Sequence, residues 1–155
     1  MTSRREFLAL ACGAFAPAAV AQLPANIEAL RKAALQEAIR KVTDGAPVKR
    51  GRVKLDVPPL IDNGNSVPLS VAVESRMTPA DHVKAIHVFT EKNPQPYVIS
   101  AFLGPRAGRA AVATRARIAD TGTVVAIAQM SDGSFWSDSV QVVVTLSACL
   151  EDGLI

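Results

Sequence analysis

Apolar and polar residues alternate with a period of two through most of the chain from Arg52 onward. Successive side chains of a β-strand point to opposite faces, so this alternation indicates half-buried strands. Residues that favour turns, chiefly Gly, Pro, Asn and Asp, divide the region into short pieces. The pattern predicts seven strands, at residues 53–57, 67–73, 83–90, 97–103, 110–119, 123–130 and 140–146. Seven short strands favour an all-β fold, an immunoglobulin-like antiparallel β-sandwich of two sheets.

One short α-helix is expected ahead of these strands. Its apolar residues recur at helical spacing, at Ile27, Leu30, Ala34, Leu35, Ala38, Ile39 and Val42. Asn26 is placed to cap its N-terminus, and Asp44-Gly45 with Pro47 favours its end. The helix has a single apolar stripe, which must lie against either the body of its own domain or a partner subunit.

The N-terminal residues have the pattern of an export signal. Arg4 and Arg5 precede a moderately apolar stretch from Leu8 to Val20, and Ala19-Val20-Ala21 matches a small-x-small cleavage site. We interpret residues 1–21 as a twin-arginine signal segment that is removed by cleavage after Ala21. This interpretation predicts export to the bacterial periplasm by the twin-arginine route.

Two other interpretations of this segment are disfavoured. As a membrane anchor the apolar stretch is short, and Gly13 and Pro17 interrupt it. Lipidation of Cys12 is weaker still, because only a few apolar residues precede it. No other segment is long and apolar enough to span a membrane.

Removal of residues 1–21 would leave 134 residues, enough for one domain whose core needs no disulfide. The removed segment holds two Arg and one Glu, so the formal charge falls from +3 to +2. A nearly balanced surface without a basic tract gives no indication of nucleic-acid binding. The chain is thus expected to comprise the signal (1–21), an N-terminal helix (22–46), the β-sandwich (47–146) and a C-terminal tail (147–155).

Cys149 is one of two cysteines and the one that remains after signal removal. A lone cysteine in an exported protein cannot form an internal disulfide. It bonds to a sulfur of another molecule, stays a reactive thiol, or is buried as a small hydrophobic residue. Its position near the C-terminus favours the first two. Val140, Val142, Val144 and Leu146 share the apolar face of the last strand, so Cys149 falls on the polar face if that strand continues.

The two histidines are not expected to form a metal site. His82 and His87 are five residues apart on one predicted strand and therefore point to opposite faces. His87 shares a face with Val83, Ala85 and Phe89, which places it at the edge of the core or at an interface. A hydrolytic dyad of Cys149 with a histidine is disfavoured, because no oxyanion-hole motif accompanies it.

Four arginines surround one loop and the strand after it: Arg106, Arg109, Arg115 and Arg117. They would contact an acidic partner or an anionic cargo, but an ordinary solvated strand face explains them more simply. Trp136 follows the Asp132-Gly133 turn and is expected to pack in the core.

Three segments together resemble the SoxY family, the sulfur-carrier subunits of the thiosulfate-oxidising Sox system. They are His82–Phe89 (HVKAIHVF), Glu91–Pro96 (EKNPQP) and Ser131–Trp136 (SDGSFW). The order of signal, helix, strands and C-terminal cysteine is also similar, so the resemblance covers most of the chain. It implies a carrier that catalyses nothing itself, holds no cofactor and pairs with a SoxZ-like subunit as a heterodimer.

The resemblance also implies a role for Cys149 as the site of covalent sulfur attachment. A haem enzyme would join thiosulfate oxidatively to this sulfur, and a hydrolase would then release sulfate. A molybdenum enzyme would oxidise the sulfane sulfur that remains. The chain would present its small inorganic cargo to each of these periplasmic enzymes in turn.

The tail departs from the Gly-Gly-Cys-Gly-Gly ending that is typical of the family. Here the sequence is Leu146-Ser147-Ala148-Cys149-Leu150, followed by Glu151 and Asp152. The glycines' backbone freedom is absent, and the two carboxylates disfavour the thiolate by like-charge repulsion. We therefore expect a divergent carrier whose thiol is activated by a partner. Two alternatives stay open, a non-covalent interaction module and a protein linked to its partner by an intermolecular disulfide through Cys149.

Overall fold

The structure is a computed structural model that describes residues 23–146. The predicted cleavage position Ala21, Cys12 and the tail with Cys149 lie outside the described residues. The chain divides into two compact units, residues 1–30 and 31–155. In the first unit the described residues, 23–30, form the first turns of helix α1 (Leu23–Thr43), and the second unit contains the rest of α1 and every described strand.

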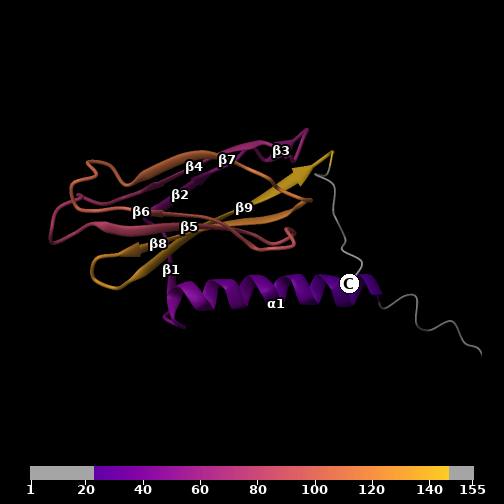
Figure 1. Cartoon of the computed structure of the whole chain (residues 1–155), viewed down its shortest axis with the longest axis horizontal. Helices are drawn as coiled ribbons and strands as arrows, with labels where there is room; N and C mark the ends of the chain where they lie inside the picture. The colour runs from indigo at the N-terminus through magenta and orange to yellow at the C-terminus, as the bar shows by residue number, and fades with distance from the viewer. Residues whose placement is uncertain (1–22, 147–155) are drawn as a thin grey trace, which may run out of the picture. The chain divides into compact units, whose positions relative to one another are not determined.

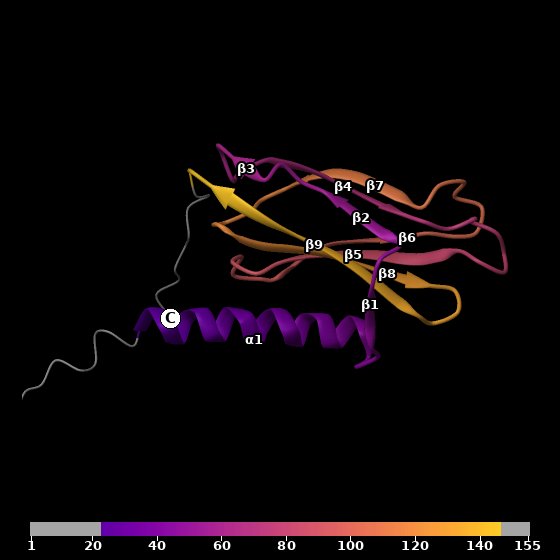
Figure 2. The ribbon, with the colours of Figure 1, turned by 180° about the vertical axis from the view of Figure 1, so that it is seen from behind.

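The strands of the second unit form two sheets that lie face to face (Figures 1 and 2). Their bounds are β1 (Val48–Arg50), β2 (Val53–Asp56), β3 (Leu60–Ile61), β4 (Val67–Val73), β5 (Val83–Thr90), β6 (Tyr97–Phe102), β7 (Ala111–Ala116), β8 (Gly122–Met130) and β9 (Phe135–Val144). The larger sheet has the order β1-β9-β8-β5-β6, with β3 also paired to β9, and the smaller sheet has the order β2-β4-β7. The predicted all-β, immunoglobulin-like sandwich is confirmed.

The main core lies between the two sheets. Strand β4 shows the expected alternation, with Val67, Leu69, Val71 and Val73 buried and the residues between them more exposed. These side chains belong to one cluster with Ile86 of β5 and the inner residues of β8 and β9. Burial of this apolar surface supplies most of the stabilisation, as in other sandwiches of this size.

The part of α1 from Arg31 onward covers the opposite face of the larger sheet. Leu35 is buried there in a separate cluster with Phe89, Ile127 and Phe135. The sequence left open whether the apolar stripe of the helix lies against its own domain or a partner subunit. At Leu35 it packs on its own domain. The helix ends where Asp44 and Gly45 take positive φ angles of 51° and 74°, a conformation that favours glycine and stops a helix.

The structure corrects several local predictions. The helix begins at Leu23, so Asn26 lies within it and does not cap it. Strand β9 begins at Phe135, five residues before the predicted start at Val140, and it ends at Val144. Leu146 is 61% exposed and is therefore not a core residue.

The alternation did not predict two short strands or the register shifts of β5, which lie between Val83 and Ala85 and between Val88 and Phe89. Strands β1 and β3 both pair parallel to β9, and neither has enough residues to show a period. A bulge between Val83 and Ala85 shifts the register of β5. As a result, the Val83 side chain packs in the main core between the two sheets, and His87 lies on the opposite face of the strand. The alternation had predicted that the two residues share a face. Among the described residues, no helix has the length and apolar character needed to cross a membrane.

Candidate functional site

The segment that leads to Cys149 is anchored up to the last described residue. The amide of Val144 donates to Thr121 Oγ1 at 2.9 Å, and the amide of Thr145 donates to the carbonyl oxygen of Ile61 at 2.9 Å. The amide of Gly64 donates to the carbonyl oxygen of Leu146 at 3.1 Å. The tail therefore starts from a fixed point at one end of the sandwich.

Asn93 braces the loops at this end. Its Nδ2 donates to the carbonyl oxygen of Arg117 at 2.9 Å, and its Oδ1 accepts from the amide of Ala119 at 2.8 Å. Ile118, which lies between Arg117 and Ala119, donates its amide to the carbonyl oxygen of Gly64 at 2.8 Å. Asn93 is thus connected through the backbone of loop 117–119 and Gly64 to Leu146. The Glu91–Pro96 segment carries part of the family resemblance, but no local pattern in the sequence indicates these contacts of Asn93.

A hollow open to solvent lies beside these loops, between the start of β6 and the end of β7. Asn93, Gln95, Tyr97, Arg115 and Arg117 are among its lining residues, and none of the lining residues is acidic. The two arginines flank the buried Ala116, so both are exposed. Arg115 Nη1 donates to the carbonyl oxygen of Ser66 at 3.2 Å.

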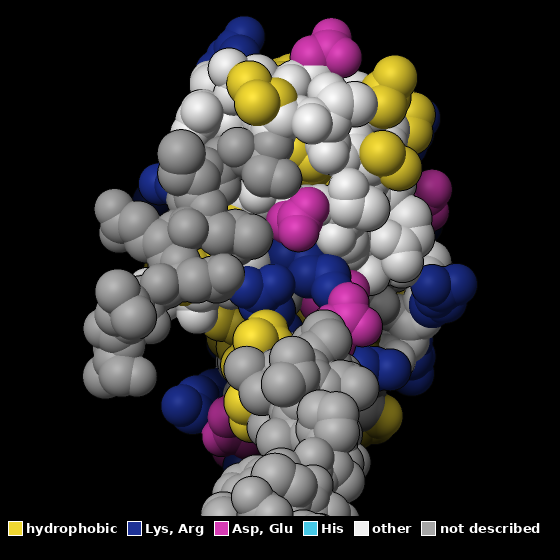
Figure 3. Space-filling view, turned by 90° about the vertical axis from the view of Figure 1, so that its right-hand side faces the viewer, with side chains coloured by type: hydrophobic (Ala, Val, Ile, Leu, Met, Phe, Trp, Pro, Cys, Tyr) yellow, Lys and Arg dark blue, Asp and Glu magenta, His cyan; other side chains and the backbone are white. Residues whose placement is uncertain are grey.

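The structure separates the four arginines that the sequence groups together. Arg106 and Arg109 lie in the connection between β6 and β7, at the start of β7, whereas Arg115 and Arg117 lie at its end. The antiparallel pairing of β7 with β4 brings Ala116 opposite Val67, near the loop that contains Gly64. Figure 3 faces the end of the sandwich where β9 stops, and Lys and Arg side chains gather near its middle beside acidic ones.

His87 lies on the outer face of the larger sheet and is 6% exposed. Its Nδ1 is hydrogen-bonded to Ser100 Oγ, which is also hydrogen-bonded to the hydroxyl of Tyr97. Burial lowers the pKa of His87 below its ordinary value of 6.5. The exposed ring of Phe102 lies edge-on to the imidazole, with 6.2 Å between ring centroids. His87 is therefore a buried, hydrogen-bonded residue on the outer face of the larger sheet.

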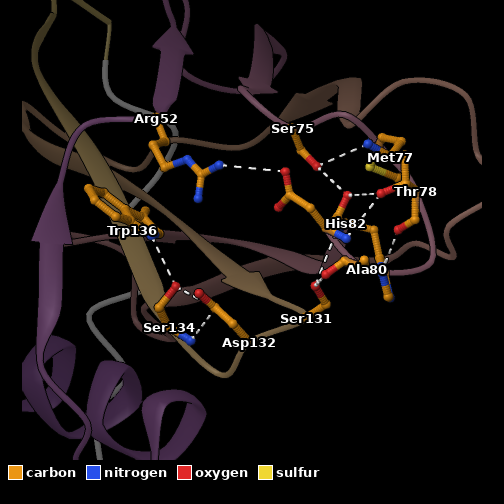
Figure 4. Close-up of polar contacts among 11 residues, drawn as sticks. Arg52, Ser75, Met77, Thr78, Ala80, His82, Ser131, Asp132, Ser134 and Trp136 are labelled. Atoms are coloured by element: carbon orange, nitrogen blue, oxygen red, sulfur yellow. Dashed lines mark hydrogen bonds and ion pairs between the residues drawn. The ribbon is translucent and has the colours of Figure 1, made fainter.

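His82 belongs to a different group of contacts, shown in Figure 4. It lies just before β5, where its Nδ1 contacts the carbonyl oxygen of Thr78 at 3.1 Å and its amide donates to Ser131 Oγ at 3.1 Å. In the described residues, 23–146, no three His, Cys, Asp or Glu side chains are grouped so that they could hold a metal ion.

Trp136 is half-buried against the main core, and its indole is flanked by cations. Lys49 Nζ lies 5.5 Å and the Arg52 guanidinium carbon 5.6 Å from the ring centroid. Trp136 Nε1 donates to Ser134 Oγ at 3.1 Å (Figure 4). The Ser134 hydroxyl donates to Asp132 Oδ1 at 2.6 Å, and this bond lowers the pKa of Asp132. These contacts fix the turn before β9 and support a packing role for Trp136.

A family model described as "Sulfur oxidation protein SoxY" matches residues 39–149. The match covers most of the chain and extends to Cys149. The chain belongs to the SoxY family. SoxY proteins are sulfur carriers of the SoxYZ sulfur-oxidation system, so membership of this family indicates a sulfur-carrier role.

Solved structures agree with this assignment. The sulfur carrier protein SoxY from Chlorobium limicola f thiosulfatophilum superposes with a TM-score of 0.62 and 26% identity, and the alignment covers 74% of this chain and 95% of that one. Superoxide reductase (neelaredoxin) from Ignicoccus hospitalis has a TM-score of 0.54 and 15% identity, with 61% and 80% covered. At that identity the likeness shows the sandwich fold alone. No curated protein sequence matches the chain.

Proposed function

We propose that this SoxY-family protein is a periplasmic carrier that holds thiosulfate-derived intermediates covalently on Cys149. The observation that carries the proposal is the extent of the family match, which reaches Cys149 although the flanking glycines are replaced. The export pattern of residues 1–21 supports the periplasmic location, with cleavage after Ala21. A SoxZ-like subunit is the proposed partner.

The anchoring of Leu146 supports a presenting role for the tail. Cys149 is three residues further along, so its Cα lies within about 11 Å of the Leu146 Cα in any conformation. The folded domain would therefore hold the sulfur at one end of the sandwich, where enzymes could reach it without unfolding any strand. The haem, hydrolase and molybdenum components of the Sox system are the proposed enzymes.

The loading step joins two sulfur atoms and requires an oxidant. The Cys149 thiol and thiosulfate form a thiosulfonate, Cys–S–S–SO₃⁻, with release of one proton and two electrons to the haem enzyme. Hydrolysis then adds one water and breaks the bond between the sulfane sulfur and the sulfonate. It releases sulfate and two protons and leaves a persulfide anion on Cys149. The carrier itself contributes the nucleophilic sulfur and its position.

The test is intact-mass measurement of the protein from cells grown on thiosulfate, before and after treatment with a reductant. We expect mass increases of one sulfane sulfur or one thiosulfonate group that the reductant removes and that map to Cys149. The Cys149→Ser variant serves as the control and should carry none.

Other results would contradict the proposal. An unmodified thiol under these growth conditions would favour a non-covalent interaction module. A covalent dimer band on a non-reducing gel, absent in Cys149→Ser, would favour a structural disulfide to a partner.

A further inference from the structure

The hollow between β6 and β7 has the chemistry of an anion site. Arg115 and Arg117 line it from the end of β7, and Gln95 lines it from the segment before β6. Guanidinium groups present five N–H donors in a planar fork that matches oxyanions. Arg115 contacts the backbone and hydroxyl oxygens of Ser66 through Nη1 alone, which leaves its other nitrogens as donors for a ligand. None of the residues that line the hollow is acidic.

The hollow is connected to the base of the tail by a short path. Leu146 is joined to Gly64 by one backbone hydrogen bond, and Gly64 is joined to Ile118 by a second. Arg117 is the residue before Ile118, and its carbonyl oxygen is held by Asn93. The three residues from Leu146 to Cys149 span up to about 11 Å, and a group attached to the sulfur extends further still. This end of the sandwich is therefore within the reach of an attached group.

We propose that the hollow lined by Arg115 and Arg117 is a subsite for the oxyanion end of the sulfur species carried on Cys149. The inference rests on the proposed carrier function and adds a binding site for the sulfonate group of the cargo. Because the arginines stay charged at all physiological pH values, the subsite would attract anionic cargo without a change of protonation. It would also offset the repulsion that Glu151 and Asp152 exert on an incoming anion.

The proposal is tested by comparing an anionic and a neutral reagent on the same thiol. The full chain with Cys12→Ser keeps Cys149 as its sole cysteine. Tetrathionate, a dianion, transfers a thiosulfonate group to the Cys149 thiolate, and thiosulfate leaves with the electron pair of the broken S–S bond. Methyl methanethiosulfonate, which is neutral, transfers a methylthio group to the same thiolate, and methanesulfinate leaves. Mass spectrometry gives both rate constants.

The ratio of the two rate constants is the informative quantity, because a change in thiolate fraction affects both reactions equally. In R115Q/R117Q we expect this ratio to fall roughly 3- to 10-fold at low ionic strength, as expected for loss of local positive charge. The difference should disappear at about 0.5 M salt, where charges are screened beyond a few ångströms. R115K/R117K should keep most of the wild-type ratio.

The matched control is R106Q/R109Q, which removes the same net charge at the other end of β7. Its ratio should stay close to the wild-type value. An unchanged ratio in R115Q/R117Q would overturn the proposal, and so would an equal fall in both double variants. Since the reactions use purified protein, their outcome is independent of whether cells load Cys149, and the two proposals fail separately.

Discussion

The carbonyl oxygen of Leu146 accepts a hydrogen bond from the amide of Gly64 at 3.1 Å. Leu146 lies two residues beyond the end of β9, and its side chain is 61% exposed, so backbone hydrogen bonding and not side-chain burial holds it. The start of the tail is thus fixed by loops from other parts of the chain.

Thr121→Val should loosen the end of β9. The substitution removes the hydroxyl oxygen that accepts the Val144 amide at 2.9 Å and keeps a similar side-chain shape. Loss of one hydrogen bond of this kind costs about 0.5–1.5 kcal/mol. Hydrogen exchange followed by NMR should show faster exchange of the Val144 amide, with the central β5 and β8 amides unchanged. Thr114→Val, at a half-buried threonine of β7, is the control, and equal protection of Val144 in both variants would contradict the prediction.

Asn93→Ala should destabilise the loops that surround the tail. Its side chain both donates to Arg117 and accepts from the amide of Ala119, so truncation leaves two backbone groups without their partners. We expect a loss of about 1–3 kcal/mol in the free energy of unfolding, measured with urea. Gln95→Ala, two residues away and exposed, should cost less than about 0.5 kcal/mol. Similar losses in the two variants would argue against the brace.

Leu35→Ala should weaken the attachment of α1 to the larger sheet. Leu35 is 5% exposed and packs with Phe89, Ile127 and Phe135, so its truncation leaves a cavity. We expect a loss of about 2–4 kcal/mol in the free energy of unfolding. Leu30→Ala makes the same change at a side chain that is 62% exposed and should cost far less. If both variants unfold at the same urea concentration, the helix does not depend on this cluster.

Acidification should destabilise the fold through His87. Burial lowers its folded-state pKa below 6.5, so the unfolded chain binds a proton more readily as the pH falls through that value. The stabilising contribution of the neutral imidazole is complete above about pH 6.5 and is lost below it. Urea unfolding at pH 7.5 and 5.5 should show a larger loss for the wild type than for His87→Gln. A loss of stability in His87→Gln as large as that of the wild type would contradict the prediction.

The sequence alone was sufficient for the features that depend on local pattern. Alternation in β4 predicted which of its side chains would be buried, because one face of a half-buried strand meets the core at every second residue. The apolar stripe of the helix was right at Leu35 but wrong at Ile27 and Leu30, which are 43% and 62% exposed. The lone Cys149 and the short segments around His87 and Asn93 were enough to identify the family, and the family match confirmed this.

Other features were decided only by tertiary structure. Strands β1 and β3 exist because β9 offers them parallel partners, and segments this short carry no readable period of their own. The bulge at Val83 reverses which face that residue occupies, and Leu146 is exposed because β9 ends before it. The separation of Arg106 from Arg117 and the link from Asn93 to the base of the tail depend on which loops meet at one end of the sandwich. These arrangements arise from contacts between residues far apart in the chain, which a local pattern does not encode.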